Sequence, residues 1–194
     1  MNKIYILSFI SLLTITSCDT IIQQSVCEKT EKNYGTKVDK IASEFNLPPE
    51  YLKALIILEC SGRKEVSPRF EKGVFNKLKE VRDGKRGHYE GVKQNDINNA
   101  SDAALKNLAS SWGPLQLMGY KCFELGIRVK DLRGEKALYW GIKWINKEYG
   151  DFLRKEKYEE AFRIHNTGQP SGKPTHDPNY VKKGLDYIDC FKNY

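Results

Sequence analysis

A carboxylate occupies a position that a helix would bury. After Pro49 the apolar residues Leu52, Leu55 and Ile56 recur at helical spacing, and the next position on this stripe is Glu59. Burial and the negative end of a helix dipole both penalise a charged carboxyl group, so both favour the protonated form of Glu59. A protonated carboxyl near neutral pH can donate a proton to a leaving oxygen. The alternative is that Glu59 simply reaches solvent from the last turn.

The segments around Glu59 predict a mainly α fold. Apolar residues recur at helical spacing in many short segments, and Ser101 is suited to cap a helix. The stretch 82–99 is polar and contains glycines, which predicts an excursion of the chain on the surface that could include a short hairpin. No internal repeat is present. The expected helices cover about 38–45, 49–59, 74–81, 103–109, 121–125, 135–149, 158–165 and 180–190.

Composition excludes several classes of protein. The 194 residues are 40% hydrophobic, too apolar for intrinsic disorder, and no apolar run is long enough to span a bilayer. The net charge is +7, but Lys and Arg alternate with acidic residues and no nucleic-acid motif is present, so we expect no nucleic-acid partner. The chain has no CxxC or HExxH pattern, and we expect no metal and no cofactor. We also expect a monomer.

The N-terminus is built like an export signal. Lys3 is followed by a short apolar stretch and then by Ile15-Thr16-Ser17-Cys18, which resembles the lipobox of bacterial lipoproteins. The resemblance implies a signal peptide over 1–17, lipid attachment at Cys18, and export to the bacterial cell membrane or outer membrane. An ordinary signal peptide with an incidental cysteine is the alternative. Residues 18–35 have no sustained period, so we expect a tether there and a folded domain over 36–194.

Four cysteines remain once Cys18 is set aside. They are Cys27, Cys60, Cys122 and Cys190, an even number in a chain expected to be exported. One or two disulfides are therefore plausible, with three possible pairings. Cys60 and Cys122 have apolar surroundings, so they can equally be small buried hydrophobic residues.

Four segments in order resemble the lysozyme-like superfamily. They are Glu59-Cys60-Ser61-Gly62, Pro68-Arg69-Phe70-Glu71, the stretch SSWGPLQLMG over 110–119, and His165-Asn166-Thr167-Gly168. Their order is similar to that of the bacterial and phage N-acetylmuramidase family, which is related to the soluble lytic transglycosylases. The resemblance covers about 38–190. Two positions depart from the pattern: Cys60 stands where most members have Ser, and His165 where they have Tyr.

The resemblance implies a goose-type lysozyme or lytic transglycosylase-like helical domain. Its groove would hold the glycan strand of peptidoglycan, with Glu59 as the general acid. By the same resemblance Gln116, Ser111, Trp112, His165 and Asn166 would line the groove, and Tyr180 could replace the missing phenol. The alternatives are a structural amide for Gln116 and a core residue for His165.

The type of cleavage depends on a second carboxylate. Inverting hydrolysis of the β-1,4 bond between N-acetylmuramic acid and N-acetylglucosamine requires one to activate water, and Glu71 is the candidate. Its alternative is an ion pair with Arg69 or Lys72. A lytic transglycosylase needs no second carboxylate, because the muramyl 6-hydroxyl attacks and leaves a 1,6-anhydro end. We expect a muramidase; the rival from another class is a lipoprotein that binds peptidoglycan without cleaving it.

Overall fold

The computed structural model is 65% helical, which confirms the mainly α fold class, and small sheets complete it. It describes the backbone of residues 6–193 and the side chains of residues 21–193. The helices are α1 (Ile6–Phe45), α2 (Pro49–Cys60), α3 (Lys72–Arg82), α4 (Gln94–Ile97), α5 (Asp102–Leu108), α6 (Lys121–Leu125), α7 (Ala137–Arg154), α8 (Tyr158–Thr167) and α9 (Tyr180–Lys192), with short 3₁₀ turns η1 (Val129–Leu132) and η2 (Gly134–Lys136). Ser101 caps α5 as expected, accepting a hydrogen bond from Ala104 N at 3.2 Å.

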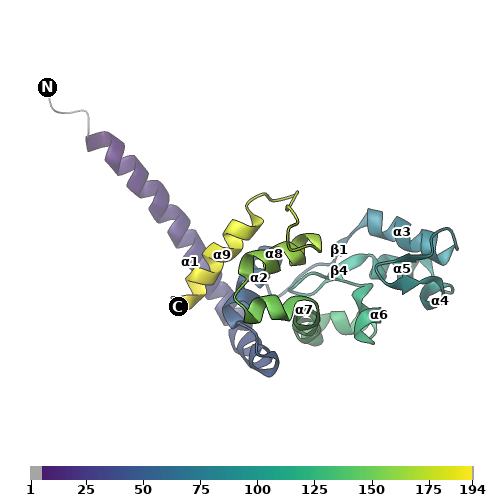
Figure 1. Ribbon diagram of the computed structural model, residues 1–194. Coiled ribbons are helices and arrows are strands. Elements are labelled where there is room, and N and C mark those ends of the chain that lie inside the picture. The colour runs from purple at the N-terminus through teal and green to yellow at the C-terminus, as the bar shows by residue number, and fades with distance from the viewer. Residues whose placement is uncertain (1–5, 194) are drawn as a thin grey trace.

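Helix α2 lies at the centre of the helical core. Pro49 starts it, since a proline needs no hydrogen-bond partner at the first helical position, and residues 51–57 are all buried. It packs mainly against α1 and α9 (Figure 1). The buried Lys53 reaches two carboxylates of α1, Glu31 and Asp39, each at 2.9 Å. This ionic contact and the apolar packing together fix α2 against α1.

The expected tether over 18–35 is wrong for the part whose side chains the structure describes. Helix α1 runs through it, and Cys27, Thr30 and Tyr34 are buried against the domain. With Val38 these residues form one stripe at helical spacing, so the packed surface of α1 begins well before residue 36. The side chain of Cys18 and the segment 1–5 lie outside the described residues, so the signal peptide and the lipid anchor stay predictions.

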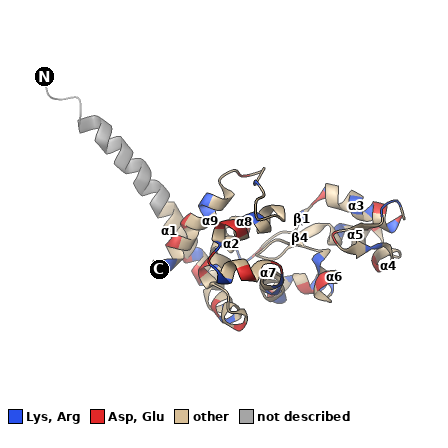
Figure 2. Cartoon of the chain, viewed as in Figure 1, with Lys and Arg blue, Asp and Glu red and all other residues tan. Residues whose placement is uncertain are grey.

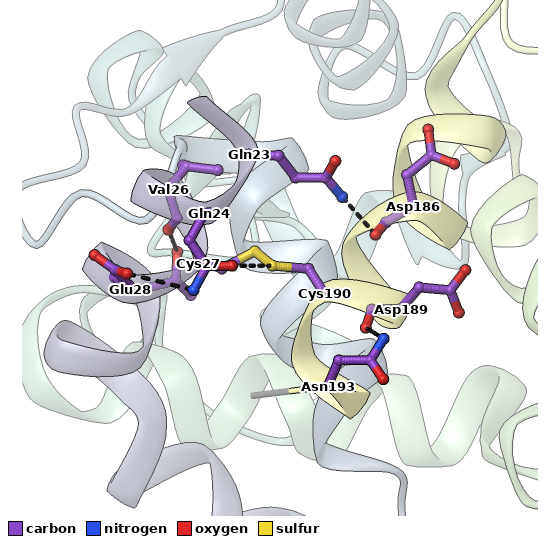
Figure 3. Close-up of a disulfide and its surroundings, with 10 residues drawn as sticks. Gln23, Gln24, Val26, Cys27, Glu28, Asp186, Asp189, Cys190 and Asn193 are labelled. Atoms are coloured by element: carbon purple, nitrogen blue, oxygen red, sulfur yellow. Dashed lines mark hydrogen bonds between the residues drawn. A yellow bond between two sulfur atoms is a disulfide. The ribbon is translucent and has the colours of Figure 1, made fainter. Parts of the chain in front are cut away.

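A disulfide between Cys27 and Cys190 joins α1 to α9 (Figure 3). One turn before Cys27, the Gln23 side chain donates a hydrogen bond to the Asp186 carbonyl at 2.7 Å. Cys60 and Cys122 are both free and buried, in agreement with the alternative that they are small core residues. Helices from the two ends of the chain are thereby held side by side.

A small antiparallel sheet brings two of the sequence motifs together. Its strand order is β1 (Arg69–Phe70), β4 (Ser110–Trp112) and β5 (Leu117–Met118), and Arg69 pairs with Ser111. A separate hairpin of β2 (His88–Tyr89) and β3 (Val92–Lys93) confirms the short hairpin in the 82–99 excursion.

The sheet lies between two groups of helices. Helices α1, α2, α8 and α9 gather at one end and α3, α4 and α5 at the other (Figure 1). Basic and acidic residues are interspersed over both groups (Figure 2). Within the residues that the structure describes, no helix is both long enough and apolar enough to cross a membrane.

Candidate active site

Glu59 lies in the last turn of α2, as the apolar stripe predicts. The helix ends because Ser61 adopts a left-handed conformation with φ of 54°, and its amide donates to the Ile57 carbonyl at 2.8 Å. The Glu59 side chain is only 14% exposed. The carboxyl group is therefore mostly withdrawn from water, at the negative end of a buried helix.

Two side chains from other helices meet one oxygen of Glu59. The Tyr180 hydroxyl, in the first turn of α9, donates a hydrogen bond to Oε1 at 2.6 Å. His165 of α8 places Nε2 at 3.7 Å from the same oxygen, a close contact but too long for a direct hydrogen bond. Oε2 has no hydrogen-bond partner among the described residues and is not sealed from solvent. The site thus holds one oxygen and leaves the other free.

The proton states of these neighbours follow from burial. Burial and the Glu59 carboxylate raise the pKa of Tyr180 well above its usual value, so its hydroxyl remains a donor. Burial lowers the pKa of His165, and the opposing effects of Glu59 and the Leu115 carbonyl are smaller. The imidazole is therefore neutral at pH 7.

Tyr149 sets the orientation of His165 from the other side. Its hydroxyl lies 2.7 Å from His165 Nδ1, and burial raises the pKa of Tyr149 well above its usual value. A protonated Tyr149 can donate to Nδ1, and this assignment leaves Nε2–H facing Glu59. The sequence alone did not single out Tyr149, because it lies on α7 and nothing in the local pattern relates it to His165.

Helix α1 holds the turn that follows Glu59. Asn33 Nδ2 donates to the Gly62 carbonyl at 2.7 Å, and the Tyr34 hydroxyl donates to the Arg63 carbonyl. Gly62 has φ of 64° and lies directly against Thr30, so a side chain there would be strained and would collide with the Thr30 hydroxyl. The segment expected to be a tether therefore positions the end of α2.

The side-chain hydrogen bonds of Ser111 and Gln116 are made within the 110–119 motif. Ser111 Oγ donates to Gln116 Oε1 at 2.6 Å, and Gln116 Nε2 donates to the Gly113 carbonyl at 3.0 Å. Ser111 is buried, and the Trp112 indole N–H donates to the Asn107 carbonyl at 2.9 Å. These are the bonds of a structural amide in the turn between β4 and β5, the alternative weighed for Gln116, and its contact with substrate stays a prediction.

Two hollows border this turn. One of about 350 Å³ is lined by Gln116, His165 and Asn166, together with Trp144 and Glu148. A larger one of about 760 Å³ is lined by Trp112, and its other walls come from residues 33–37, 64–68 and 133–135. Of the residues expected to line one groove, Trp112 lies in the larger hollow, Gln116, His165 and Asn166 lie in the smaller one, and Ser111 and Tyr180 line neither.

Glu71 makes no hydrogen bond or ion pair with Glu59, Tyr180 or His165 among the described residues. It precedes α3, is 40% exposed, and pairs with Arg69 at 2.8 Å, the alternative weighed for it from sequence. A different carboxyl pair lies beside the smaller hollow. Glu148 lines this hollow, and hydrogen bonding with the neighbouring Glu124 raises the pKa of Glu148. Sequence spacing did not indicate this pair, since the two residues belong to α7 and α6.

The group around Glu59 combines a mostly buried carboxyl, one oxygen that accepts from a phenol, and one oxygen with no hydrogen-bond partner among the described residues, although Glu59 itself lines neither hollow. Among the described residues no three or more His, Cys, Asp and Glu side chains are grouped closely enough to hold a metal ion. In comparisons with known proteins, no family model, no curated protein and no solved structure matches this chain.

Proposed function

We propose that this protein cleaves the glycan strand of peptidoglycan at the β-1,4 bond between N-acetylmuramic acid and N-acetylglucosamine, with a lysozyme-like domain and Glu59 as general acid. The observation that supports it most strongly is the arrangement at Glu59. The carboxyl is 14% exposed, Tyr180 donates to Oε1, and Oε2 remains free. We infer the substrate, peptidoglycan, from the order of the four sequence motifs on a mainly helical fold.

The geometry suits proton transfer through Oε2. Because Tyr180 already donates to Oε1, the acidic proton belongs on Oε2, where it can reach the glycosidic oxygen. When that proton leaves, the Tyr180 hydroxyl stabilises the carboxylate that remains. Neutral His165 adds a polar N–H beside the same oxygen without introducing a positive charge, which would favour the ionised form of Glu59.

A lytic transglycosylase is the second candidate, and Glu71 is the observation that favours it. Its ion pair with Arg69 and its exposure leave the general acid without an evident partner carboxylate. Intramolecular attack by the muramyl 6-hydroxyl needs no such partner. Glu71→Gln distinguishes the two: a muramidase that uses Glu71 loses activity about a hundredfold or more, whereas a transglycosylase keeps it.

Export and lipid attachment at Cys18 belong to the same proposal. The disulfide between Cys27 and Cys190 supports an oxidising compartment, where such bonds persist. Labelling cells with a radioactive fatty acid tests the anchor: wild type should take up label, and Cys18→Ser should not. Unlabelled wild-type protein would reject the lipid anchor while leaving the catalytic proposal intact.

The catalytic proposal is tested by the products released from purified peptidoglycan. Wild type should release muropeptides, and Glu59→Gln should release none while still binding the sacculi. A wild-type protein that binds sacculi but releases no muropeptides would instead favour a lipoprotein that binds peptidoglycan without cleaving it.

A further inference from the structure

The hollow of about 760 Å³ is larger than a single sugar ring needs, and α1 forms one of its walls. Asn33, Tyr34 and Lys37 come from α1, and the loop 64–68 that follows Glu59 forms a second wall. Residues 112–114 and 133–135 complete it. Asn33 and Tyr34, which line the hollow, also bond the carbonyls of Gly62 and Arg63 in the turn after Glu59, so the hollow borders the end of α2 that carries the carboxyl group.

Three basic side chains line this hollow: Lys37, Lys64 and Arg133. All three are exposed, and none forms an ion pair with a side chain that the structure describes, although many other basic residues do. The Arg133 guanidinium lies 4.0 Å from the centre of the Trp112 ring, and the ring is itself fixed by its hydrogen bond to Asn107. The hollow therefore presents cations that are free to meet an anionic ligand.

Two carboxylates also face the hollow. Glu65 and Glu135 line it, and neither pairs with a described basic side chain. The lining therefore has three basic side chains and two carboxylates, and none of the five forms an ion pair with a described side chain. A neutral sugar could form hydrogen bonds with these groups but would not neutralise their charge, whereas a peptide with free carboxylates and an amino group would pair with both signs.

We propose that this hollow binds the peptide portion of the peptidoglycan strand, with its free carboxylates on Lys37, Lys64 and Arg133. This inference rests on the proposed function, because it assigns the part of the same substrate that carries charge. Glu59 would act on the glycan while the hollow selects strands that still bear peptide. Trp112 offers its remaining surface to the apolar parts of that peptide.

Binding to the full-length Glu59→Gln protein tests the inference without turnover. Three probes are titrated by calorimetry: a disaccharide-tetrapeptide with free carboxylates, the same molecule with those carboxylates amidated, and the disaccharide without peptide, whose lactyl carboxylate is free. The first should bind about tenfold more tightly than either of the others, because only it supplies carboxylates to all three cations. Equal affinity for the first two probes would overturn the inference. The inference would also be overturned if the disaccharide without peptide bound as tightly as the first probe, because the hollow would then bind the lactyl carboxylate rather than the peptide.

Variants of the lining assign the preference to this hollow. In the Glu59→Gln background, Lys37→Gln combined with Arg133→Gln should abolish the tenfold preference, and Lys40→Gln, on the same helix but outside the hollow, should retain it. A preference that survives the double substitution contradicts the inference. Cleavage of sacculi by the protein with native Glu59 is measured in parallel. Its absence would reject the proposed function, whereas cleavage without any peptide preference would reject the peptide site alone.

Discussion

The Tyr180 hydroxyl occupies one oxygen of Glu59, so the two oxygens differ before any substrate arrives. The contact joins residues 121 positions apart, and only the packing of α9 on α2 creates it. A hydrogen bond to a charged group contributes roughly 1.5–3 kcal/mol, which is enough to matter for a carboxyl that must lose its proton during the reaction.

Tyr180→Phe should lower the rate of peptidoglycan cleavage by about 10- to 100-fold, because the carboxylate formed after proton transfer loses its donor. The fold should be retained, since the aromatic ring still occupies its place, and far-UV circular dichroism checks this. Tyr187→Phe is the matched control: Tyr187 lies on the same helix, two turns after Tyr180, has no hydrogen bond to Glu59 among the described residues, and should keep full activity when substituted. Equal loss in both variants would assign the effect to α9 rather than to the hydroxyl.

His165 makes the stability depend on pH. Burial lowers its pKa in the folded protein, so the unfolded chain takes up a proton at higher pH than the folded one. The contribution of His165 is therefore complete above its unfolded pKa of about 6.5 and is lost as the pH falls below it. Urea unfolding at pH 8 and pH 5 should show that the stability of wild type relative to His165→Gln decreases at pH 5. A relative stability that increases at pH 5 would contradict a buried, neutral imidazole.

At the scale of elements, α1 and α9 act as a pair. Helix α1 holds the turn after Glu59 through Asn33 and Tyr34, and α9 supplies Tyr180. The disulfide between Cys27 and Cys190 joins these two helices directly (Figure 3). Both supports of the carboxyl group are therefore connected by one covalent bond.

Cys27→Ser combined with Cys190→Ser should lower the free energy of unfolding by about 2–5 kcal/mol, because the bond closes a long loop in the unfolded chain. Activity should fall as well, since both helices reach Glu59. Dithiothreitol should reproduce the two losses in wild type and have no further effect on the double variant. Wild-type stability that is insensitive to the reductant would contradict this role of the bond.

Most helices could be predicted from the sequence, because their stripes consist of strongly apolar residues. The segment before residue 36 could not, since its buried stripe includes Cys27 and Thr30, which do not stand out as apolar. The location of Glu59 at the end of a buried helix also followed from periodicity. Its contacts with Tyr180 and His165 depend on tertiary packing. The internal bonding of Gln116 depends on the turn between β4 and β5, which no local pattern revealed.

At the scale of the whole molecule, the folded domain includes much of α1. Cys27, Thr30, Tyr34 and Val38 are buried, and Lys53 pairs with Glu31 and Asp39. Removing the residues before 36 would take away Cys27, Thr30 and Tyr34, expose the apolar surface that they cover, and remove Glu31, one of the two carboxylates that pair with the buried Lys53, which is costly.

A chain that begins at residue 36 should therefore fail to fold, whereas one that begins at residue 21 should fold and remain active. Circular dichroism with thermal unfolding measures the first property, and release of muropeptides measures the second. A stable, cooperative domain over 36–194 would show that α1 is only a tether after all.

The most direct test of the central claim is mass spectrometry of the products that wild type and Glu59→Gln release from purified peptidoglycan. Wild type should release muropeptides with reducing muramic ends, and Glu59→Gln should reduce their yield by at least about a hundredfold while still sedimenting with sacculi. Products with 1,6-anhydro ends would make the protein a lytic transglycosylase with the same general acid. Equal yields from both proteins, or no product from a wild type that binds sacculi, would contradict the role of Glu59.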